Sequence, residues 1–208
     1  MKDYDIYLFD FDGTLVNSED SLIRVFTKAY ESVDITIEEK VVKTLMRIPL
    51  SKGYQDLNGP LDKVEIFKAT IIKTLNEEET TKKTKLYDDT IRVIKELVKN
   101  NKKVGIVTSN NTTHVKDVLS FFKIRKNLFS VIVGNDTISI HKPHPEPIYK
   151  ALAMLNYLGP LDKVVYIGDA LDDVSAGKAA GVSYLLLDRD NEYLDYQEEK
   201  ISSLDELL

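Results

Sequence analysis

The sequence predicts a doubly wound α/β fold, in which a mostly parallel sheet has helices on both faces and a small helical segment is inserted. Short apolar stretches alternate with helical patterns along most of the chain, which is typical of such folds. Residues 16–84 break this alternation, because they contain helical patterns and no convincing strand. We therefore expect a core formed by residues 1–15 and 85–208 and a helical insertion at 16–84.

Five short apolar stretches are the candidate core strands: 6–9, 104–107, 131–133, 164–167 and 184–187. Four segments with the apolar pattern of a helix lie between these stretches. They are marked by Ile91/Ile94/Val98, Val115/Val118/Leu119/Phe122, Ile148/Ala151/Leu152/Leu155 and Val174/Ala176/Ala179. Pro145 and Pro147 predict the start of the third helix, and Gly181 predicts the end of the fourth.

The insertion carries its own helix-start signals. Ser18 precedes an apolar helical stripe, and the pairs Thr36/Glu39 and Asp62/Glu65 have capping-box spacing. These signals predict three helices between the first two core strands.

Two acids follow the first strand directly. Asp10 and Asp12 end the apolar run, and Gly13 allows the chain to turn away. Residues i and i+2 of an extended strand point the same way, so both acids can address one point. An Asp pair also serves as an ordinary turn or helix cap, and the rest of the chain has to decide between these interpretations.

A cluster of hydroxyl and amide side chains follows the second strand, at Thr108, Ser109, Asn110, Asn111 and Thr112. It can cap the next helix, and it can also bind a phosphate together with the main-chain amides of that helix start. The two interpretations are compatible.

A lysine and a second acidic group complete the edge of the predicted sheet. Lys142 lies in a loop stiffened by Pro143 and Pro145, and Asp169 and Asp173 follow the fourth strand. Asp173 could also simply stabilise a helix dipole. If the carboxylates of Asp10, Asp12 and Asp169 converge at about 5 Å, each pair repels by roughly 3 kcal/mol, so a cation is expected among them. Hard oxygen ligands select Mg²⁺, whereas His141 and His144 lack the partners of a zinc site.

The composition excludes several classes of protein. The chain has 208 residues, a net charge of −6 and no cysteine, so we expect no nucleic-acid partner, no disulfide and no thiolate chemistry. No apolar run is long enough to span a membrane, and the start of the chain leads into a strand rather than a secretion signal. We expect a cytoplasmic protein with a small-molecule partner; a monomer and a homodimer are equally compatible with the sequence.

In these motifs the chain resembles the haloacid dehalogenase-like hydrolase superfamily, and within it the phosphoglycolate phosphatase-like group. The matching motifs are Asp-x-Asp-Gly-Thr at 10–14, a hydroxyl at Thr108, Lys-Pro-x-Pro at 142–145, and Gly-Asp-x-x-x-Asp at 168–173. The resemblance implies a Rossmann-like core with a helical cap, and a phosphatase that forms an aspartyl-phosphate intermediate.

The resemblance also implies roles for individual residues. Asp10 is the nucleophile, Asp12 is the general acid and base, and Thr108 and Lys142 hold the phosphoryl oxygens. Mg²⁺ is bound by Asp10, the Asp12 carbonyl and Asp169, with Asp173 in support. An acid at position 12 favours phosphomonoester chemistry, since a halide leaving group needs no proton.

The substrate is expected to be a small phosphomonoester, either phosphoglycolate-like or a sugar phosphate. Arg47 and Lys52 of the insertion are candidate substrate-binding residues that would offer positive charge to an anionic leaving group. A phosphosugar mutase of the same superfamily fits the motifs as well. The non-enzymatic alternative is a phospho-accepting receiver or binding protein, although a receiver is shorter and has no helical insertion.

Overall fold

The computed structural model describes residues 3–46, 48 and 50–208. The chain divides into two compact units, Met1–Asn17 with Leu86–Leu208, and Ser18–Lys85. Two short strands, β2 (Val16–Asn17) and β3 (Lys85–Leu86), form a two-stranded sheet of their own.

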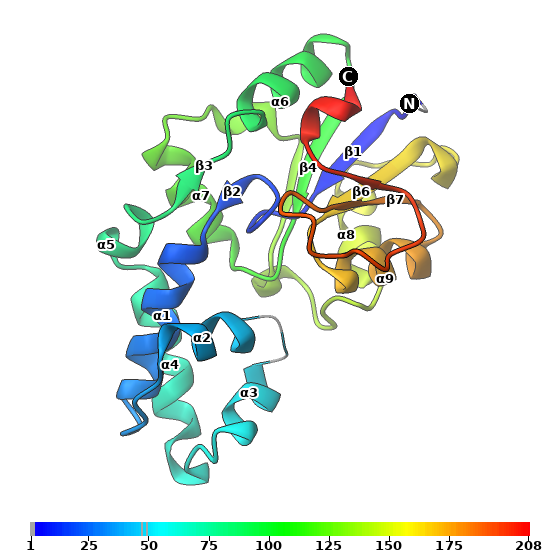
Figure 1. Ribbon diagram of the computed structural model, residues 1–208. Coiled ribbons are helices and arrows are strands. Elements are labelled where there is room, and N and C mark those ends of the chain that lie inside the picture. The colour runs from blue at the N-terminus through cyan, green and yellow to red at the C-terminus, as the bar shows by residue number, and fades with distance from the viewer. Residues whose placement is uncertain (1–2, 47, 49) are drawn as a thin grey trace. The chain divides into compact units, whose positions relative to one another are not determined.

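The larger unit is built on a parallel sheet with the order β5-β4-β1-β6-β7-β8 (Figure 1). Its strands are β1 (Ile6–Phe9), β4 (Lys103–Val107), β5 (Val131–Val133), β6 (Val164–Gly168), β7 (Ser183–Leu187) and β8 (Lys200–Ile201). The chain adds strands to one side of β1 and then to the other, so the strand order reverses at the centre of the sheet. Such a reversal opens a crevice beyond the carboxyl ends of the strands, where ligands bind in this class of fold.

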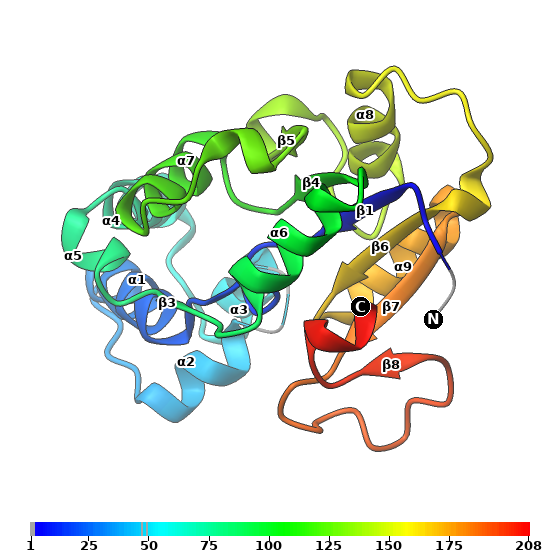
Figure 2. The same cartoon turned by 90° about the horizontal axis from the view of Figure 1, so that it is seen from above.

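Helices cover both faces of this sheet (Figure 2). They are α6 (Thr90–Lys99), α7 (Thr112–Phe121), α8 (Glu146–Met154) and α9 (Leu171–Ala180). Short 3₁₀ helices occupy the connections: η2 (Lys126–Leu128), η3 (Asn135–Thr137), η4 (Leu161–Lys163) and η5 (Leu204–Leu207).

The alternation of side chains along β1 explains the two layers. Tyr7 and Phe9 belong to the apolar cluster that α6 and α7 complete, whereas Ile6 and Leu8 belong to the cluster completed by α8 and α9. A strand buried on both faces reads as a continuous apolar run, as this one does. The predicted doubly wound fold is confirmed.

The smaller unit consists almost entirely of helices: α1 (Glu19–Glu31), α2 (Glu39–Leu45), α3 (Leu50–Asp56), η1 (Leu61–Lys63), α4 (Val64–Leu75) and α5 (Glu78–Thr81). Three aromatic rings, Tyr30, Tyr54 and Phe67, form its centre, with ring centroids 4.6 to 6.4 Å apart. These rings give the unit an apolar core of its own.

The helix-start signals gave mixed results. Ser18 does hold the N-cap position of α1, without a side-chain cap bond, and α8 begins beside Pro145 as predicted. The capping boxes at Thr36/Glu39 and Asp62/Glu65 are wrong. The residues before α2 and α4 are Glu38 and Lys63, and neither helix has a side-chain cap bond.

Three strands were not predicted. β2 lies inside the stretch for which we expected no strand, and β3 and β8 were not among the expected strands. Each of the three is two residues long, which is too short for an alternation of apolar and polar residues to be seen. None of the described helices is both long enough and apolar enough to cross a membrane.

Candidate active site

Three parallel strands deliver the predicted site residues to one edge of the sheet. Asp10 follows β1, Thr108 follows β4, and Asp169 follows β6. The pairing of β1 with β4 and with β6 sets these strand ends side by side. The Asp10 N–H donates to the carbonyl of Ile167 at 2.8 Å, which continues the sheet into the site.

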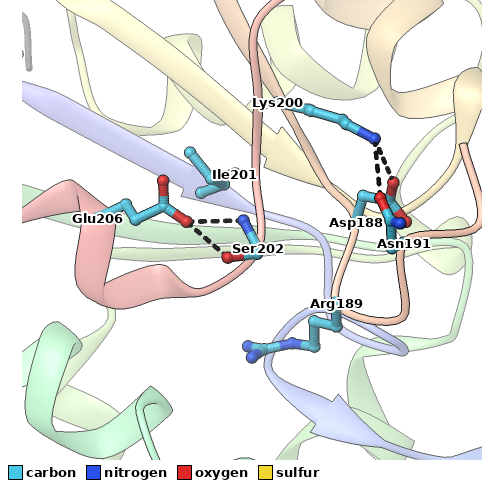
Figure 3. A pocket seen from close by; sticks show the side chains of 7 residues that line it. All are labelled: Asp188, Arg189, Asn191, Lys200, Ile201, Ser202 and Glu206. Atoms are coloured by element: carbon cyan, nitrogen blue, oxygen red, sulfur yellow. Dashed lines mark hydrogen bonds and ion pairs between the residues drawn. The ribbon is translucent and has the colours of Figure 1, made fainter. Parts of the chain in front are cut away.

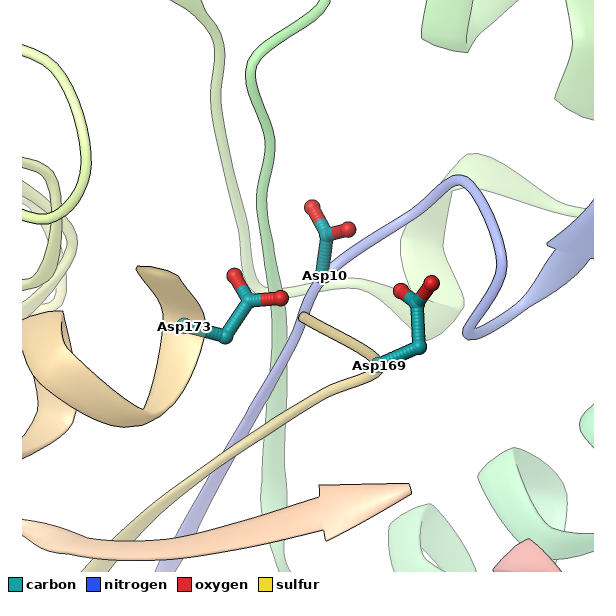
Figure 4. Close-up of side chains that lie close together, drawn as sticks. All are labelled: Asp10, Asp169 and Asp173. Atoms are coloured by element: carbon teal, nitrogen blue, oxygen red, sulfur yellow. The ribbon is translucent and has the colours of Figure 1, made fainter. Parts of the chain in front are cut away.

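The carboxylates of Asp10, Asp169 and Asp173 gather at this edge, with ligand oxygens within 4.8 Å of one another (Figure 4). Asp173 comes from the first turn of α9, so two strands and a helix contribute to the cluster. At this separation each charged pair repels by about 3 kcal/mol at an effective dielectric near 20. Burial, and next the charge of Asp173, raise the pKa of Asp169 to about 7.

Lys142 enters the cluster from the loop before α8, and its side chain is only 8% exposed. Its ammonium lies 2.9 Å from Asp10 Oδ1 and 2.6 Å from Asp173 Oδ1. Burial opposes the charge of Lys142, but the two carboxylates outweigh burial and raise its pKa well above the usual value. For Asp10 burial has the larger effect, so its pKa is raised well above the usual value in spite of Lys142.

Tyr166 is a site residue that the sequence analysis missed. It lies in β6, and its hydroxyl contacts both Lys142 and Asp173. Burial raises its pKa well above the usual value, so the hydroxyl keeps its proton. A signal was present in the sequence, because a tyrosine inside a buried strand needs a partner for its hydroxyl.

Asp12 lies apart from the three clustered carboxylates. The side-chain amide of Asn110 donates to Asp12 Oδ2, so this acid is held by the loop after β4. The cluster that forms therefore contains Asp173 where the strand geometry favoured Asp12. Asn110 belongs to the predicted cluster of hydroxyl and amide side chains, but its contact with Asp12 was not predicted.

The turn after Asp12 is shaped to admit Asp169. Gly13 has φ +77°, and a Cβ at this position would lie 2.1 Å from Asp169 Oδ2. Only glycine combines this backbone angle with that space. The hydroxyl of Thr14 then donates to Asp169 Oδ1 at 3.1 Å and orients the carboxylate.

The hydroxyl and amide side chains that follow β4 make different contacts. Thr108 is buried, and its Oγ1 accepts the N–H of Asn110 at 3.1 Å. Ser109 is exposed, and its carbonyl accepts from the side chain of Asn135. The helix cap is Asn111, whose side chain accepts the N–H of His114. The cap interpretation is thus correct for Asn111, and Thr108 stays beside the strand end.

Of the two candidate substrate-binding residues in the insertion, the structure describes only Lys52. Lys52 lies in α3 with its ammonium 3.3 Å from Asp56 Oδ1, in an exposed pair. Arg47 lies outside the described residues. A substrate-binding function for either remains a prediction.

A pocket of about 300 Å³ lies elsewhere in the larger unit, around the ends of β7 and β8 (Figure 3). It is lined by Asp188, Arg189, Asn191, Lys200, Ile201, Ser202 and Glu206. Its charged side chains are engaged within the protein: Lys200 pairs with Asp188, and Arg189 pairs with Asp89 outside the pocket. The pocket shares no residue with the carboxylate cluster.

The clustered residues suit a divalent cation. All three side chains offer carboxylate oxygens, which are hard ligands. They are crowded enough to repel one another, and the ammonium of Lys142 is the positive charge that contacts two of them. This set of donors fits magnesium better than a softer metal.

Comparison with known proteins agrees with this arrangement. Residues 7–187 match the family model described as haloacid dehalogenase-like hydrolase. A provisionally named pyrophosphatase PpaX of Caldanaerobacter subterraneus subsp. tengcongensis is 31% identical over 176 residues, which cover 84% of this chain and 77% of that protein. The phosphoglycolate phosphatase of Colwellia psychrerythraea is 28% identical, with coverage of 88% and 83%.

A similar solved structure leads to the same family. The crystal structure of a provisionally assigned haloacid dehalogenase-like hydrolase from Bacteroides fragilis has a TM-score of 0.86 and 27% identity, and the match covers 99% of this chain and 100% of that one. The predictions of the fold and of a hydrolytic enzyme are therefore confirmed. The chain belongs to the haloacid dehalogenase-like hydrolase family.

Proposed function

We propose that this protein is a Mg²⁺-dependent phosphatase that hydrolyses small phosphomonoesters through an aspartyl-phosphate on Asp10. The observation that carries the proposal is the convergence of Asp10, Asp169, Asp173 and Lys142 at one edge of the sheet. A nucleophile, a cation site and a fixed positive charge within a few ångströms are what transfer of a phosphoryl group requires.

In the first step, a carboxylate oxygen of Asp10 attacks phosphorus and the bond to the leaving oxygen breaks. Asp12 gives a proton to that oxygen, so the alcohol leaves neutral. The position of Asp12 supports this assignment, because its contact with Asn110 keeps it outside the carboxylate cluster and available to a different atom.

In the second step, the deprotonated Asp12 accepts a proton from water, and the resulting hydroxide attacks the phosphorus of the intermediate. The bond between phosphorus and Asp10 breaks, which releases inorganic phosphate and restores both acids. Lys142 and Thr108 stabilise the negative charge on the phosphoryl oxygens during both steps.

A divalent cation held by Asp10, Asp169 and Asp173 together with the Asp12 carbonyl would offset the repulsion among the three carboxylates and neutralise charge on the phosphoryl group. Lys142 alone leaves an excess of negative charge among these groups. Thr14, through its bond to Asp169, keeps one ligand in a fixed orientation.

The substrate class follows from the relatives together with the proposed chemistry. One relative is named a phosphoglycolate phosphatase, and others carry the name pyrophosphatase. We propose a small anionic phosphoester as the substrate, either phosphoglycolate-like or a sugar phosphate. Pyrophosphate should be tested as well.

The test measures phosphate release from phosphoglycolate, sugar phosphates, nucleotides and pyrophosphate, with Mg²⁺ or with excess EDTA. At least one compound should be hydrolysed with Mg²⁺ and not with EDTA, and Asp10→Asn should be inactive on it. Hydrolysis that persists in EDTA, or in Asp10→Asn, would contradict the proposal.

A further inference from the structure

Tyr166 connects the parts of the candidate site that come from different elements. Its side chain is buried in the apolar cluster beneath α8 and α9, and only the hydroxyl reaches the carboxylates. This oxygen lies 2.8 Å from Asp173 Oδ1, 3.1 Å from the Lys142 ammonium and 3.0 Å from the carbonyl of Val107. It therefore contacts the lysine, a metal-binding candidate and the end of β4.

The ammonium of Lys142 has three N–H donors, and the site offers three acceptors. Two are carboxylate oxygens of Asp10 and Asp173, and the third is the hydroxyl of Tyr166. The ammonium nitrogen also lies 5.8 Å from the centre of the Tyr166 ring, within the range of cation–π attraction. Three acceptors in three directions fix both the position and the rotation of the ammonium group.

One of these contacts has to change during the proposed reaction. When Asp10 attacks phosphorus, its negative charge is lost into the new bond, and its hold on the ammonium weakens. The N–H that pointed at Asp10 is then free for a phosphoryl oxygen. The contacts with Asp173 and Tyr166 involve no reacting atom and persist through both steps.

We propose that Tyr166 is a positioning residue for Lys142. Its hydroxyl, together with Asp173, holds the ammonium so that the N–H that first contacts Asp10 can point at the reacting phosphoryl group. This inference rests on the proposed function, since it assigns a supporting residue to the same site. Tyr166 itself touches neither substrate nor water in this role.

A purely structural role makes a different prediction. If the hydroxyl only satisfied the carbonyl of Val107, its removal would change the stability of the sheet and leave the lysine and the turnover number intact. The experiment must therefore observe the ammonium group directly as well as the reaction.

The decisive variant is Tyr166→Phe, which removes one oxygen and keeps the ring in its apolar cluster. We expect kcat to fall about 10-fold, because a mispositioned charge stabilises the transition state less, while KM changes much less. In protein labelled with ¹⁵N-lysine, the Lys142 ammonium signal, assigned by its absence from Lys142→Gln, should be sharp in the wild type and lost or broadened in Tyr166→Phe.

Tyr184→Phe is the matched control, since Tyr184 is the direct neighbour of Tyr166 in β7 and its hydroxyl contacts Glu198 instead. This variant should keep both the wild-type kcat and the ammonium signal. An unchanged ammonium signal in Tyr166→Phe, with or without a lower kcat, would overturn the inference, and so would a wild-type protein without an ordered Lys142 signal. If the wild type hydrolyses no ester but its ammonium signal still depends on Tyr166, the positioning stands and the proposed function fails.

Discussion

The two acids of the first motif are only two residues apart, yet their surroundings differ. Asp10 is buried against Lys142, whereas Asp12 is half-buried and accepts a hydrogen bond from Asn110. A carboxylate beside an ammonium is held in place for attack on phosphorus. A carboxylate that accepts from a neutral amide can still exchange its proton with a leaving group or with water. The surroundings thus support a different role for each acid.

Asp10→Asn should abolish turnover, with a loss of at least about 10⁴-fold, and should leave no covalent species. Asp12→Asn should still form the intermediate from an aryl phosphate, because this leaving group needs no proton, but it lacks the base that activates water. We therefore expect an aspartyl-phosphate to accumulate in Asp12→Asn. Intact-protein mass spectrometry should detect the phosphate adduct, and hydroxylamine should remove it.

The defect of Asp12→Asn should also shrink as the leaving group improves, since Thr108 and Lys142 are unaltered. Equal loss of activity on every ester, without an adduct in either variant, would show that Asp12 is not the acid–base residue.

At this scale the sequence located the charged residues and missed their neutral partners. Asp10 and Asp169 directly follow strands, and Lys142 lies in the connection from β5 to α8, so the rule that ligands bind at the carboxyl ends of strands was enough to bring them together. Tyr166 and Asn110 act through hydrogen bonds of a side-chain hydroxyl and a side-chain amide. Such contacts depend on side-chain direction across the sheet, which spacing along one strand does not give.

Among the elements, the loop after β7 contacts both the start of α6 and the Asp-x-Asp-Gly-Thr motif at 10–14. Arg189 forms two parallel hydrogen bonds to Asp89, at 2.9 and 3.0 Å, and a third to the carbonyl of Thr14. Ser203 and the N–H of Leu204 also donate to Asp89. A single carboxylate before α6 thus holds the ends of two distant segments.

The pH dependence of this contact has a definite sign. Burial opposes the charge of Asp89, but the hydrogen bonds from Arg189, Leu204 and Ser203 outweigh burial and lower its pKa. A lowered pKa in the folded state stabilises the protein above the unfolded pKa of about 3.9, and this stabilisation is lost as pH falls through the folded value.

Asp89→Asn should lower the free energy of unfolding by about 2 kcal/mol at neutral pH, as expected for the loss of charged hydrogen bonds in a mostly buried pair. Urea denaturation at a series of pH values should show the difference from wild type constant down to about pH 5 and shrinking below about pH 4. Asp205→Asn is the control, since its pair with Arg92 is exposed and should contribute little at any pH. A deficit of Asp89→Asn that persists unchanged at pH 3 would contradict this account.

The sequence could not have shown this contact. Asp89 and Arg189 are a hundred positions apart, and Ser203 and Leu204 reach Asp89 because β8 and η5 carry the chain back to α6. By contrast, the long core strands were predicted within a residue at each end, because their apolar runs are unbroken. Elements held by distant partners, such as β8, leave little trace in their own few residues.

For the molecule as a whole, the carboxylate cluster that we propose for function lowers the stability of the folded state. Asp169 has a pKa of about 7 in place of its ordinary value of 3.8, because burial and Asp173 disfavour its charge. A carboxyl whose pKa is raised by folding destabilises the folded state at any pH where it is ionised in the unfolded chain. Metal binding at the same three carboxylates would reverse that cost.

Asp169→Asn should therefore be more stable than the wild type in EDTA, by more than about 1 kcal/mol at pH 8, because it removes the buried charge. In Mg²⁺ the order should reverse. A ligand at 100 times its Kd stabilises the folded state by about 2.7 kcal/mol, and the variant should lose most of this gain together with its activity. Thermal unfolding with EDTA, MgCl₂ and CaCl₂ measures both effects.

Calcium should stabilise the wild type yet inhibit it, since its longer bonds and higher coordination number disturb the geometry of attack. Asp172→Asn, an exposed neighbour on α9, should behave as wild type throughout. If Mg²⁺ raises the Tm of Asp169→Asn as much as that of the wild type, Asp169 is not a metal ligand and the cation site has to be sought elsewhere.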